Sequence, residues 1–433
     1  EYYTDDTKTT KATAKRATSA DEEVDTTTDY YVHPAFANES SIGYANGGWD
    51  KELTGIWVAK FEAGYASGNN NAPVKASSVN YTQTYSWVLA KEAGTEKDSR
   101  QPSRNWLDGI YGTITGQDTN GNNIYGWKNG QQTAIKYPTF QPKTYSMNYI
   151  TVNDSYNISK ALTEEGNIYG LNNSTTDSHL IKNSEWGAVA YLAQSSFGNN
   201  GTEPYINNIT LNGGSRQRTD DIAGGTGVDS VYAVTGVTKG SISAGTAGST
   251  IDNINSTTGN TANSGVYTWD QKNGQKSSST LNMYGVFDMS GITWIQTTGY
   301  ISNGHWNLVD FGSSLTDSLR RITSTKYVTI YPHNNITDNT SIMSNDSNIP
   351  TASSANYLNT HIYGDAIRET STSGTASTSW NGNVSCFPAL GYPFIVRGGN
   401  YYAVGSTTGL FYFNRASGEG RFHNGFRSVL IAL

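Results

Sequence analysis

The chain has 433 residues, of which 35% are apolar and 15% are charged, and its formal net charge at pH 7 is −7. This composition excludes a disordered polyelectrolyte and a membrane protein, and its 46 Gly and 29 Tyr are typical of a β-rich, loop-rich extracellular protein. We expect no nucleic-acid partner, because one would require clustered Lys and Arg, and no membrane span, because no apolar run is long enough.

The first 29 residues carry a basic patch and then an acidic one, with almost no apolar side chains. Such a segment cannot bury a core, so residues 1–29 are predicted to form a flexible charged linker or stalk. One domain is expected over residues 30–433. Because the sequence begins with Glu1 rather than methionine, we also expect that an N-terminal export or anchoring segment was removed.

Two regular elements are predicted in the first half of that domain. Residues 55–64, GIWVAKFEAG, alternate in the period-two manner of a strand and contain β-branched side chains. In residues 183–194, apolar side chains recur at intervals of three and four, which predicts a helix. We expect Asn183 or Ser184 to cap its start and Gly198 to lie beyond its end.

Polar, Gly-rich stretches interrupt the second half of the domain. Residues 199–264 and 303–350 are predicted to be loop-rich insertions. Between them, Asn273 and Gly274 predict a β-hairpin. Residues 394–433 read as successive short strands. We therefore expect an α+β fold with short strands, few helices and large polar loop insertions.

The sequence shows no constellation of residues for catalysis or metal binding. Its six His are scattered, no Gly-rich phosphate loop ends in Lys and Ser or Thr, and no serine elbow occurs. The lone cysteine, Cys386, cannot form an internal disulfide and is interpreted as a small buried residue in VSCFPAL. We predict no enzyme activity, no catalytic residues, no metal site and no cofactor.

Five short motifs nevertheless occur in a known order. They are GIWVAKFEAG (55–64), NSEWGAVAYLA (183–193), YGVFDMSGITW (284–294), VRGGNY (396–401) and NGFRSVLIAL (424–433). Together they resemble the C-type lectin fold in its formylglycine-generating-enzyme branch, also called sulfatase-modifying-factor-like. There a first strand, an EW helix, a GLYDMSGNVWEW turn, an RGGSW strand and a terminal GFR strand frame the core. The resemblance covers most of residues 30–433 outside the insertions and implies that fold.

Two departures from this branch bear on function. Its enzymes look to active-site cysteines for the oxidation of sulfatases, whereas Cys386 stands alone and outside the terminal motif. After the SG of the turn, the family has Asn and Glu, associated there with calcium, where this chain has Ile292 and Ile295. The departures argue against the oxidase chemistry and against the family's metal site.

The tail is more similar still to the variable proteins of diversity-generating retroelements, which end in RGG, a run of variable polar positions, FYFNR and GFR. In that family, adenine-directed mutagenesis of a C-terminal repeat rewrites Asn-type codons, and the altered side chains gather on one solvent-facing surface that binds ligands. The resemblance implies a variable region at about residues 397–427. The ligand-binding positions that it implies are Tyr401, Tyr402, Ala403, Val404, Thr407, Thr408, Leu410, Tyr412, Ala416, Ser417, Glu419, Arg421, Phe422, His423 and Asn424.

The residue types of the tail agree with a rigid framework. Gly398 and Gly399 permit a bulge or a close approach of the backbone in a strand. The guanidinium groups of Arg397, Arg415 and Arg427 are expected to donate hydrogen bonds to carbonyls and to fix the surrounding loops.

Alternation in GLFYFN predicts that Phe411 and Phe413 pack inward while Leu410 and Tyr412 are presented. The remaining positions mix rigid aromatic rings with adaptable polar groups, as antibody paratopes do.

The sequence thus predicts an extracellular ligand-binding protein, an adhesin or receptor binder displayed on a bacterial cell surface or a phage virion. Its partner is expected to be an unidentified protein or cell-surface ligand. Two alternatives stay open at this point. One is an enzyme related to formylglycine-generating oxidases, with Cys386 as its catalyst. The other is a structural surface protein, which fits residues 1–29 and the insertions but does not explain the aromatic tail.

Overall fold

The computed structural model describes residues 32–39, 47–65, 113–117, 123–126, 138–144, 146–147, 150–163, 167, 169–211, 232–240, 242, 249–251, 266–316, 326–331, 364–374, 377, 379–401, 407–421 and 423–433. The predicted linker at residues 1–29 lies outside these ranges. Within them the helices are few and the strands form several small sheets, so the fold is mixed α+β.

The largest sheet comes from the second half of the chain. Its strand order is β13–β12–β14–β15, and β16 also pairs with β12. Strand β14 is antiparallel to both β12 and β15, whereas β13 and β16 run parallel to β12. These strands are β12 (Trp294–Ile301), β13 (Thr329–Tyr331), β14 (Phe394–Gly398), β15 (Gly409–Ala416) and β16 (Asn424–Phe426). The strands predicted in the tail are therefore confirmed.

A second sheet joins the two ends of the described chain. Strand β17 (Ser428–Ala432) lies between β1 (Trp57–Val58) and β6 (Thr176–Leu180) and is antiparallel to both. The strand predicted over residues 55–64 is shorter than expected. After β1 the backbone leaves this sheet, and the Lys60 carbonyl accepts a hydrogen bond from the Phe287 N–H instead.

The remaining strands form small sheets. They are β2 (Gly64–Tyr65) with β5 (Pro138–Thr139), β3 (Thr113–Gln117) with β4 (Asn123–Gly126), β9 (Val237–Thr238) with β11 (Tyr267–Thr268), and the three-stranded sheet of β7 (Ile209–Leu211), β8 (Tyr232–Ala233) and β10 (Ser249–Ile251).

Helix α6 (Asn183–Gln194) has the bounds that the sequence predicts. Its N-cap is Lys182, however, so the predicted caps Asn183 and Ser184 are wrong by one or two positions. The reason is that the Glu185 carboxylate reaches back and accepts the Lys182 main-chain N–H at 2.9 Å, which satisfies the helix start without a Ser or Asn cap.

The other helices are shorter. They are α5 (Val152–Ala161), α7 (Lys272–Gln275), α8 (Asn307–Asp310) and the 3-10 turn η4 (Trp380–Gly382). The hairpin predicted at Asn273 and Gly274 is wrong, because α7 occupies this segment. The side-chain oxygen of Gln271 accepts the Thr268 N–H, and its carbonyl accepts the Gln275 N–H, which closes a helical turn.

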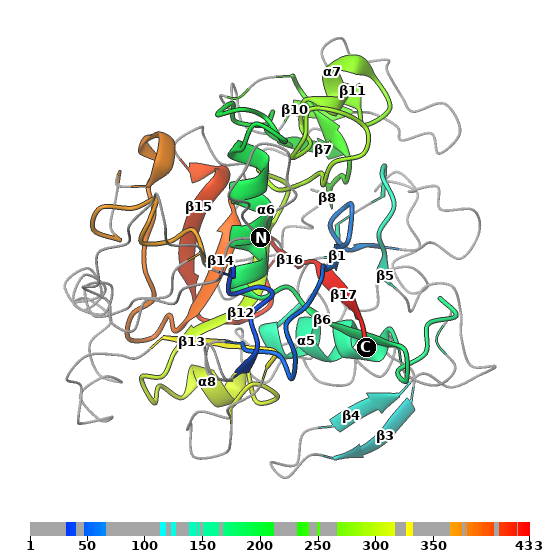
Figure 1. Cartoon of the computed structure of the whole chain (residues 1–433), viewed down its shortest axis with the longest axis vertical. Helices are drawn as coiled ribbons and strands as arrows, with labels where there is room; N and C mark the ends of the chain where they lie inside the picture. Colours follow the sequence, from blue (N-terminus) through cyan, green and yellow to red (C-terminus); the bar gives the residue numbers. More distant parts are fainter. Residues whose placement is uncertain are drawn as a thin grey trace, which may run out of the picture.

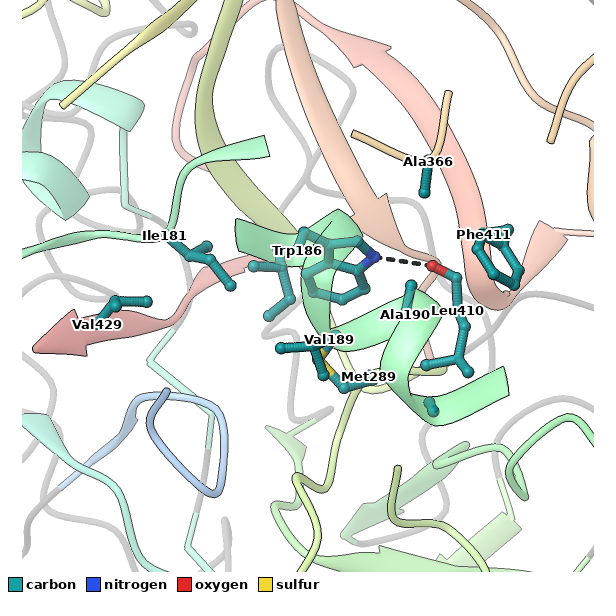
Figure 2. Close-up of a cluster of buried hydrophobic side chains, with 11 residues drawn as sticks. Ile181, Trp186, Val189, Ala190, Met289, Ala366, Leu410, Phe411 and Val429 are labelled. Atoms are coloured by element: carbon teal, nitrogen blue, oxygen red, sulfur yellow. Dashed lines mark hydrogen bonds between the residues drawn. The ribbon is translucent and has the colours of Figure 1, made fainter. Parts of the chain in front are cut away.

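Helix α6 crosses the middle of the molecule, with β14 and β15 on one side of it and β1 and β17 on the other (Figure 1). Its buried face supplies Trp186, Val189 and Ala190 to the core cluster drawn in Figure 2. Leu410 and Phe411 of β15 complete that cluster. The C-terminal strands are thus packed directly on the central helix.

The described parts of the predicted insertions belong to the packed body. Within 199–264, the Asn207 amide donates to the Asp288 carboxylate at 2.8 Å, and the Gly236 N–H donates to the same carboxylate at 2.9 Å. Within 303–350, β13 is an edge strand of the largest sheet. Most of both stretches lies outside the described residues, and their described parts pack among the strands.

None of the helices among the described residues has the length and apolar character needed to cross a lipid bilayer.

Candidate functional site

The C-terminal region is anchored in the core by Arg397, a fully buried residue of β14. Its guanidinium donates to the carbonyls of Asp365 at 3.0 Å and Ala366 at 3.3 Å and to the side-chain oxygen of Asn183 at 3.2 Å. The start of α6, the segment at residues 364–370 and β14 are therefore joined by one side chain. The role predicted for Arg397 is confirmed.

Arg427 is the second buried anchor. Its guanidinium donates to the carbonyls of Ala59, Phe287 and Asp288, so it joins three segments that are distant in sequence. The carboxylate of Asp288 and that of Glu62 lie close enough to act electrostatically on this group. Because Arg427, Phe287 and Asp288 are buried, these charge-assisted hydrogen bonds fix the main chain around Arg427.

The third arginine differs, since Arg415 is half-buried and its guanidinium lies over the Tyr392 ring, 5.6 Å from the centroid. The two glycines after Arg397 adopt positive φ, +84° at Gly398 and +87° at Gly399, and the strand register shifts between Arg397 and Gly398, as the predicted bulge requires. A Cβ on Gly399 would lie 2.4 Å from the Thr407 carbonyl oxygen. Only glycine lets the main chain at position 399 approach the Thr407 carbonyl so closely.

The prediction of alternating faces on β15 is wrong for Leu410 and Tyr412, because both are buried, as are Phe411 and Phe413. Elements cover both sides of the strand. The Trp186 indole of α6 donates to the Leu410 carbonyl at 2.7 Å, and the rings of Tyr191 and Trp380 pack against Phe411. A strand with apolar residues at consecutive positions is typical of burial on both faces.

Burial divides the ligand-binding positions that the resemblance implies. Three are half-buried and reach the surface: Thr407, Ser417 and Arg421. Eight are buried in the protein: Tyr401, Thr408, Leu410, Tyr412, Ala416, Glu419, His423 and Asn424. Four lie outside the described residues: Tyr402, Ala403, Val404 and Phe422. The buried side chains cannot contact a ligand without leaving the core.

Several of the buried positions bear framework contacts. The Glu419 carboxylate pairs with Arg421, and its main-chain carbonyl accepts the Asn424 amide at 3.0 Å. The His423 ring packs edge-on against Trp294, with ring centroids 4.5 Å apart. The loop between β15 and β16 is therefore tied together by the same residue types that the resemblance assigns to binding.

An exposed aromatic ring adjoins the start of β15. Trp380, on η4, keeps 45% of its surface exposed, and its ring packs on Phe411 with centroids 5.5 Å apart. Its indole N–H donates to the half-buried carboxylate of Glu203. We call these two residues the Trp380–Glu203 pair. They come from separate polar stretches, STSWNG and GTEPY, which carry no periodic signal, so sequence reasoning missed them.

The Glu203 carboxylate accepts hydrogen bonds that are long. Its oxygens accept the Gln194 amide and the Leu410 N–H, each at 3.4 Å, the long end of the hydrogen-bond range. Removal from water raises the pKa of Glu203 to about 7, and the hydrogen bonds from Leu410 and Trp380 oppose that rise. Among the described residues, no cationic side chain acts on this pKa.

Several buried amide and hydroxyl groups without a hydrogen-bond partner lie where β14 ends and β15 begins. They include Nδ2 of Asn383, both side-chain polar atoms of Asn400 and Oγ1 of Thr408. Asn383 and Glu203 both border Gly409, where an added Cβ would lie 2.7 Å from Asn383 Nδ2 and 3.6 Å from Glu203 Oε2. The buried polar atoms at the start of β15 therefore have fewer hydrogen-bond partners than the guanidinium groups of Arg397 and Arg427.

The other buried charged cluster is internal. His179 Nε2 and Glu185 Oε1 are 2.8 Å apart, and Lys182 donates to the Gly47 carbonyl at 2.8 Å. Attraction to Glu185 raises the pKa of His179 against the effect of its burial. All three side chains are fully buried, so this network links α6 to its neighbours and offers no surface to a substrate.

The positions related to metal and thiol chemistry are occupied by apolar packing. Ile292 and Ile295 are fully buried, and Ile295 belongs to the core cluster around Trp186. The Cys386 thiol is half-buried, and its burial raises the pKa of the thiol. In the part of the chain that the structure describes, no group of three or more His, Cys, Asp or Glu is placed to hold a metal ion.

Comparison of the sequence with protein-family models and with curated proteins gives no match.

Proposed function

We propose that this chain is a non-enzymatic ligand-binding protein, displayed on a bacterial surface or a virion, whose C-terminal variable region presents exchangeable side chains on a C-type lectin scaffold. The observation that carries the proposal is the packing where β14 ends and β15 begins. The base of this region is held by buried Arg397, and beside it stands the exposed ring of Trp380. A rigid base with an aromatic rim suits recognition at low entropic cost.

The arrangement of strands supports the scaffold part of the proposal. The motifs that prompted the resemblance fall on β1, α6, β14 and β17, and the first and last of these pair with each other. Strands β12, β14 and β15 form an antiparallel group against α6. The chain therefore brings these motifs together around one helix.

Within this proposal, burial decides which of the implied positions belong to the variable surface. Thr407, Ser417 and Arg421 are assigned to it because they reach the surface, together with the predicted positions that lie outside the described residues. The buried positions of β15, including Leu410 and Tyr412, are assigned to the framework. A surface exchange alters stability by about 0.5 kcal/mol or less, whereas a core exchange costs several times more.

The thiol chemistry of an oxidase receives no support from Cys386. Burial disfavours its thiolate, and its main-chain N–H is committed to the Phe413 carbonyl at 3.3 Å. A nucleophilic cysteine would need an accessible and electropositive setting.

Population sequencing tests the proposal. The codons for residues 397–427 would be amplified from many independent isolates and read in depth. We expect substitutions to concentrate at adenines in codons for surface positions such as Thr407 and Ser417, and to spare Arg397, Phe413 and Arg427. A genomic repeat of these codons that differs at adenines, next to a reverse transcriptase gene, would support the same conclusion. Substitutions spread evenly over all codon positions would reject the proposal.

A display experiment tests the division between surface and framework. One library would randomise Thr407, Ser417 and Arg421, and a matched library would randomise Leu410, Tyr412 and Phe413. We expect most members of the first library, and few of the second, to be displayed as protease-resistant proteins. Equal survival of the two libraries would contradict the assignment.

A further inference from the structure

The Trp380–Glu203 pair combines a fixed aromatic face with an acid. Phe411 supports one side of the Trp380 ring, and the indole N–H is bound to Glu203, so the ring has little freedom to rotate. Trp380 as a whole keeps 45% of its surface exposed. An indole held in this way offers its electron-rich face to a ligand at a small cost in side-chain entropy.

Among the residues that the structure describes, no cationic side chain acts on the acid of the pair. Glu203 is held by the Gln194 amide, the Leu410 N–H and the Trp380 indole, all of which are neutral donors. A carboxylate has about four lone-pair sites, and two of the three donors approach only to 3.4 Å, so it retains acceptor capacity for a stronger donor. A half-buried carboxylate gains most from a cation.

We propose that the Trp380–Glu203 pair binds an arginine side chain of a partner protein, with the guanidinium stacked on the Trp380 ring and donating to the Glu203 carboxylate. This inference rests on the proposed ligand-binding function and names one chemical feature of its partner. Arginine is favoured over lysine because its planar group both stacks on an aromatic face and donates through two parallel N–H groups. The net charge of −7 adds a general attraction for a basic partner.

The charged state of Glu203 sets the pH dependence of this contact. The groups that meet the carboxylate are Gln194 of α6, Leu410 of β15 and Trp380 of η4, and none of them titrates in the range of interest. Lys276, whose carbonyl accepts the Tyr205 N–H, is engaged over the Tyr205 ring at 5.5 Å. Glu203 has a pKa raised to about 7, so its ionised form is mostly present at pH 8 and mostly lost at pH 6.

The test uses the intact protein and the peptide Ac-Gly-Arg-Gly-NH2, with peptides that carry lysine or citrulline in place of arginine. Binding would be followed by the shift of the Trp380 indole signal in NMR spectra, assigned with Trp380→Phe. We expect millimolar binding of the arginine peptide, at least ten-fold weaker binding of the citrulline peptide, and an intermediate affinity for the lysine peptide. Since arginine stays charged throughout, affinity should fall about five- to ten-fold from pH 8 to pH 6 as Glu203 is protonated.

Two variants separate the site from general effects. Glu203→Gln keeps the shape of the side chain and should weaken binding at least ten-fold at pH 8 and abolish its pH dependence. Trp57→Phe, at another exposed tryptophan, on β1, should leave binding unchanged. Equal binding of the citrulline or lysine peptide, or no shift of the Trp380 signal at 20 mM arginine peptide, would overturn the proposal.

These outcomes are independent of the tests of the proposed function. Neither Trp380 nor Glu203 lies within residues 397–427, so codon variation in that region can be found whether or not arginine binds. Codon variation without arginine binding would reject only the inference about the partner. Arginine binding without codon variation would reject the variable-region proposal and leave this subsite in place.

Discussion

The indole nitrogen of Trp186 donates a 2.7 Å hydrogen bond to the main-chain carbonyl of Leu410, which joins the central helix to β15 (Figure 2). This contact explains why β15 is buried on the face that the sequence assigned to solvent. The carbonyl has been removed from water, so its partner must come from the protein. The helix therefore holds in place the strand that borders the candidate site.

Replacing Trp186 by Phe should lower the free energy of unfolding by about 2–4 kcal/mol, because it leaves the Leu410 carbonyl without a donor and opens a cavity. Urea denaturation would measure the change. The matched control is Trp57→Phe, since Trp57 is 63% exposed and should change stability by about 0.5 kcal/mol or less. Similar losses in both variants would show that the buried bond has no special role.

Replacing Arg397 by Lys should lower the free energy of unfolding by about 2–4 kcal/mol, although the charge is retained. An ammonium cannot reach the Asp365 and Ala366 carbonyls together with Asn183 in the geometry of the guanidinium fork. Arg415→Lys provides the comparison, since that residue is half-buried over a tyrosine ring. We expect the second variant to resemble wild type in urea melts; an equally unstable Arg415→Lys would contradict the distinction.

Burial raises the pKa of Glu62 to about 8, although hydrogen bonds from Ser146 and Thr293 act in the opposite direction. The folded state therefore binds a proton that the unfolded state releases near pH 4.5, so stability should fall as pH rises from about 4.5 to 8. Glu62→Gln, which mimics the protonated acid, should flatten this decline. Asp288 has a pKa raised in the same direction by its burial, so a smaller slope should remain.

Urea melts at pH 5, 6, 7 and 8 would measure both slopes. The control is Glu52→Gln, which changes an exposed acid outside the Glu62 cluster and should leave the pH slope unchanged. An identical pH slope in wild type and Glu62→Gln would show that Glu62 is ionised in the folded protein.

Replacing Gly425 by Ala should lower the free energy of unfolding by about 3 kcal/mol or more, as overpacking of a core does. The added Cβ would lie 2.0 Å from Glu62 Oε1 and 2.2 Å from Thr293 Oγ1. Gly55→Ala is the control, because an added Cβ there meets nothing within 4 Å. Thermal melts of the two proteins would show the difference, and a stable Gly425→Ala variant would mean that β16 can shift away from Glu62.

The Cys386 thiol should react slowly with iodoacetamide in the folded protein, because burial raises its pKa and lowers the fraction of thiolate. At pH 8 we expect a rate at least ten-fold below that of glutathione, followed by mass spectrometry. In 6 M guanidinium chloride the rate should rise to that of an ordinary cysteine. A folded-state rate above that of glutathione would indicate an activated thiol and would revive the oxidase alternative.

Local patterns in the sequence predict the parts of the fold that local interactions control. The apolar spacing over residues 183–194 gives α6 its bounds, and the β-rich segments of the tail give β14, β15 and β17. The roles of Gly399 and Arg397 also follow from residue type, since few other residues adopt a positive φ and no other side chain donates through a planar fork.

Contacts between distant segments decide the rest. Whether Tyr412 faces water depends on what packs over β15, and the Trp380–Glu203 pair joins two polar stretches that have no pattern to link them. The sequence by itself determined α6 and the strands of the tail, because hydrogen bonding and side-chain spacing act over a few residues. Only the tertiary structure decided which faces are covered and which groups meet, because burial is a property of the assembled chain.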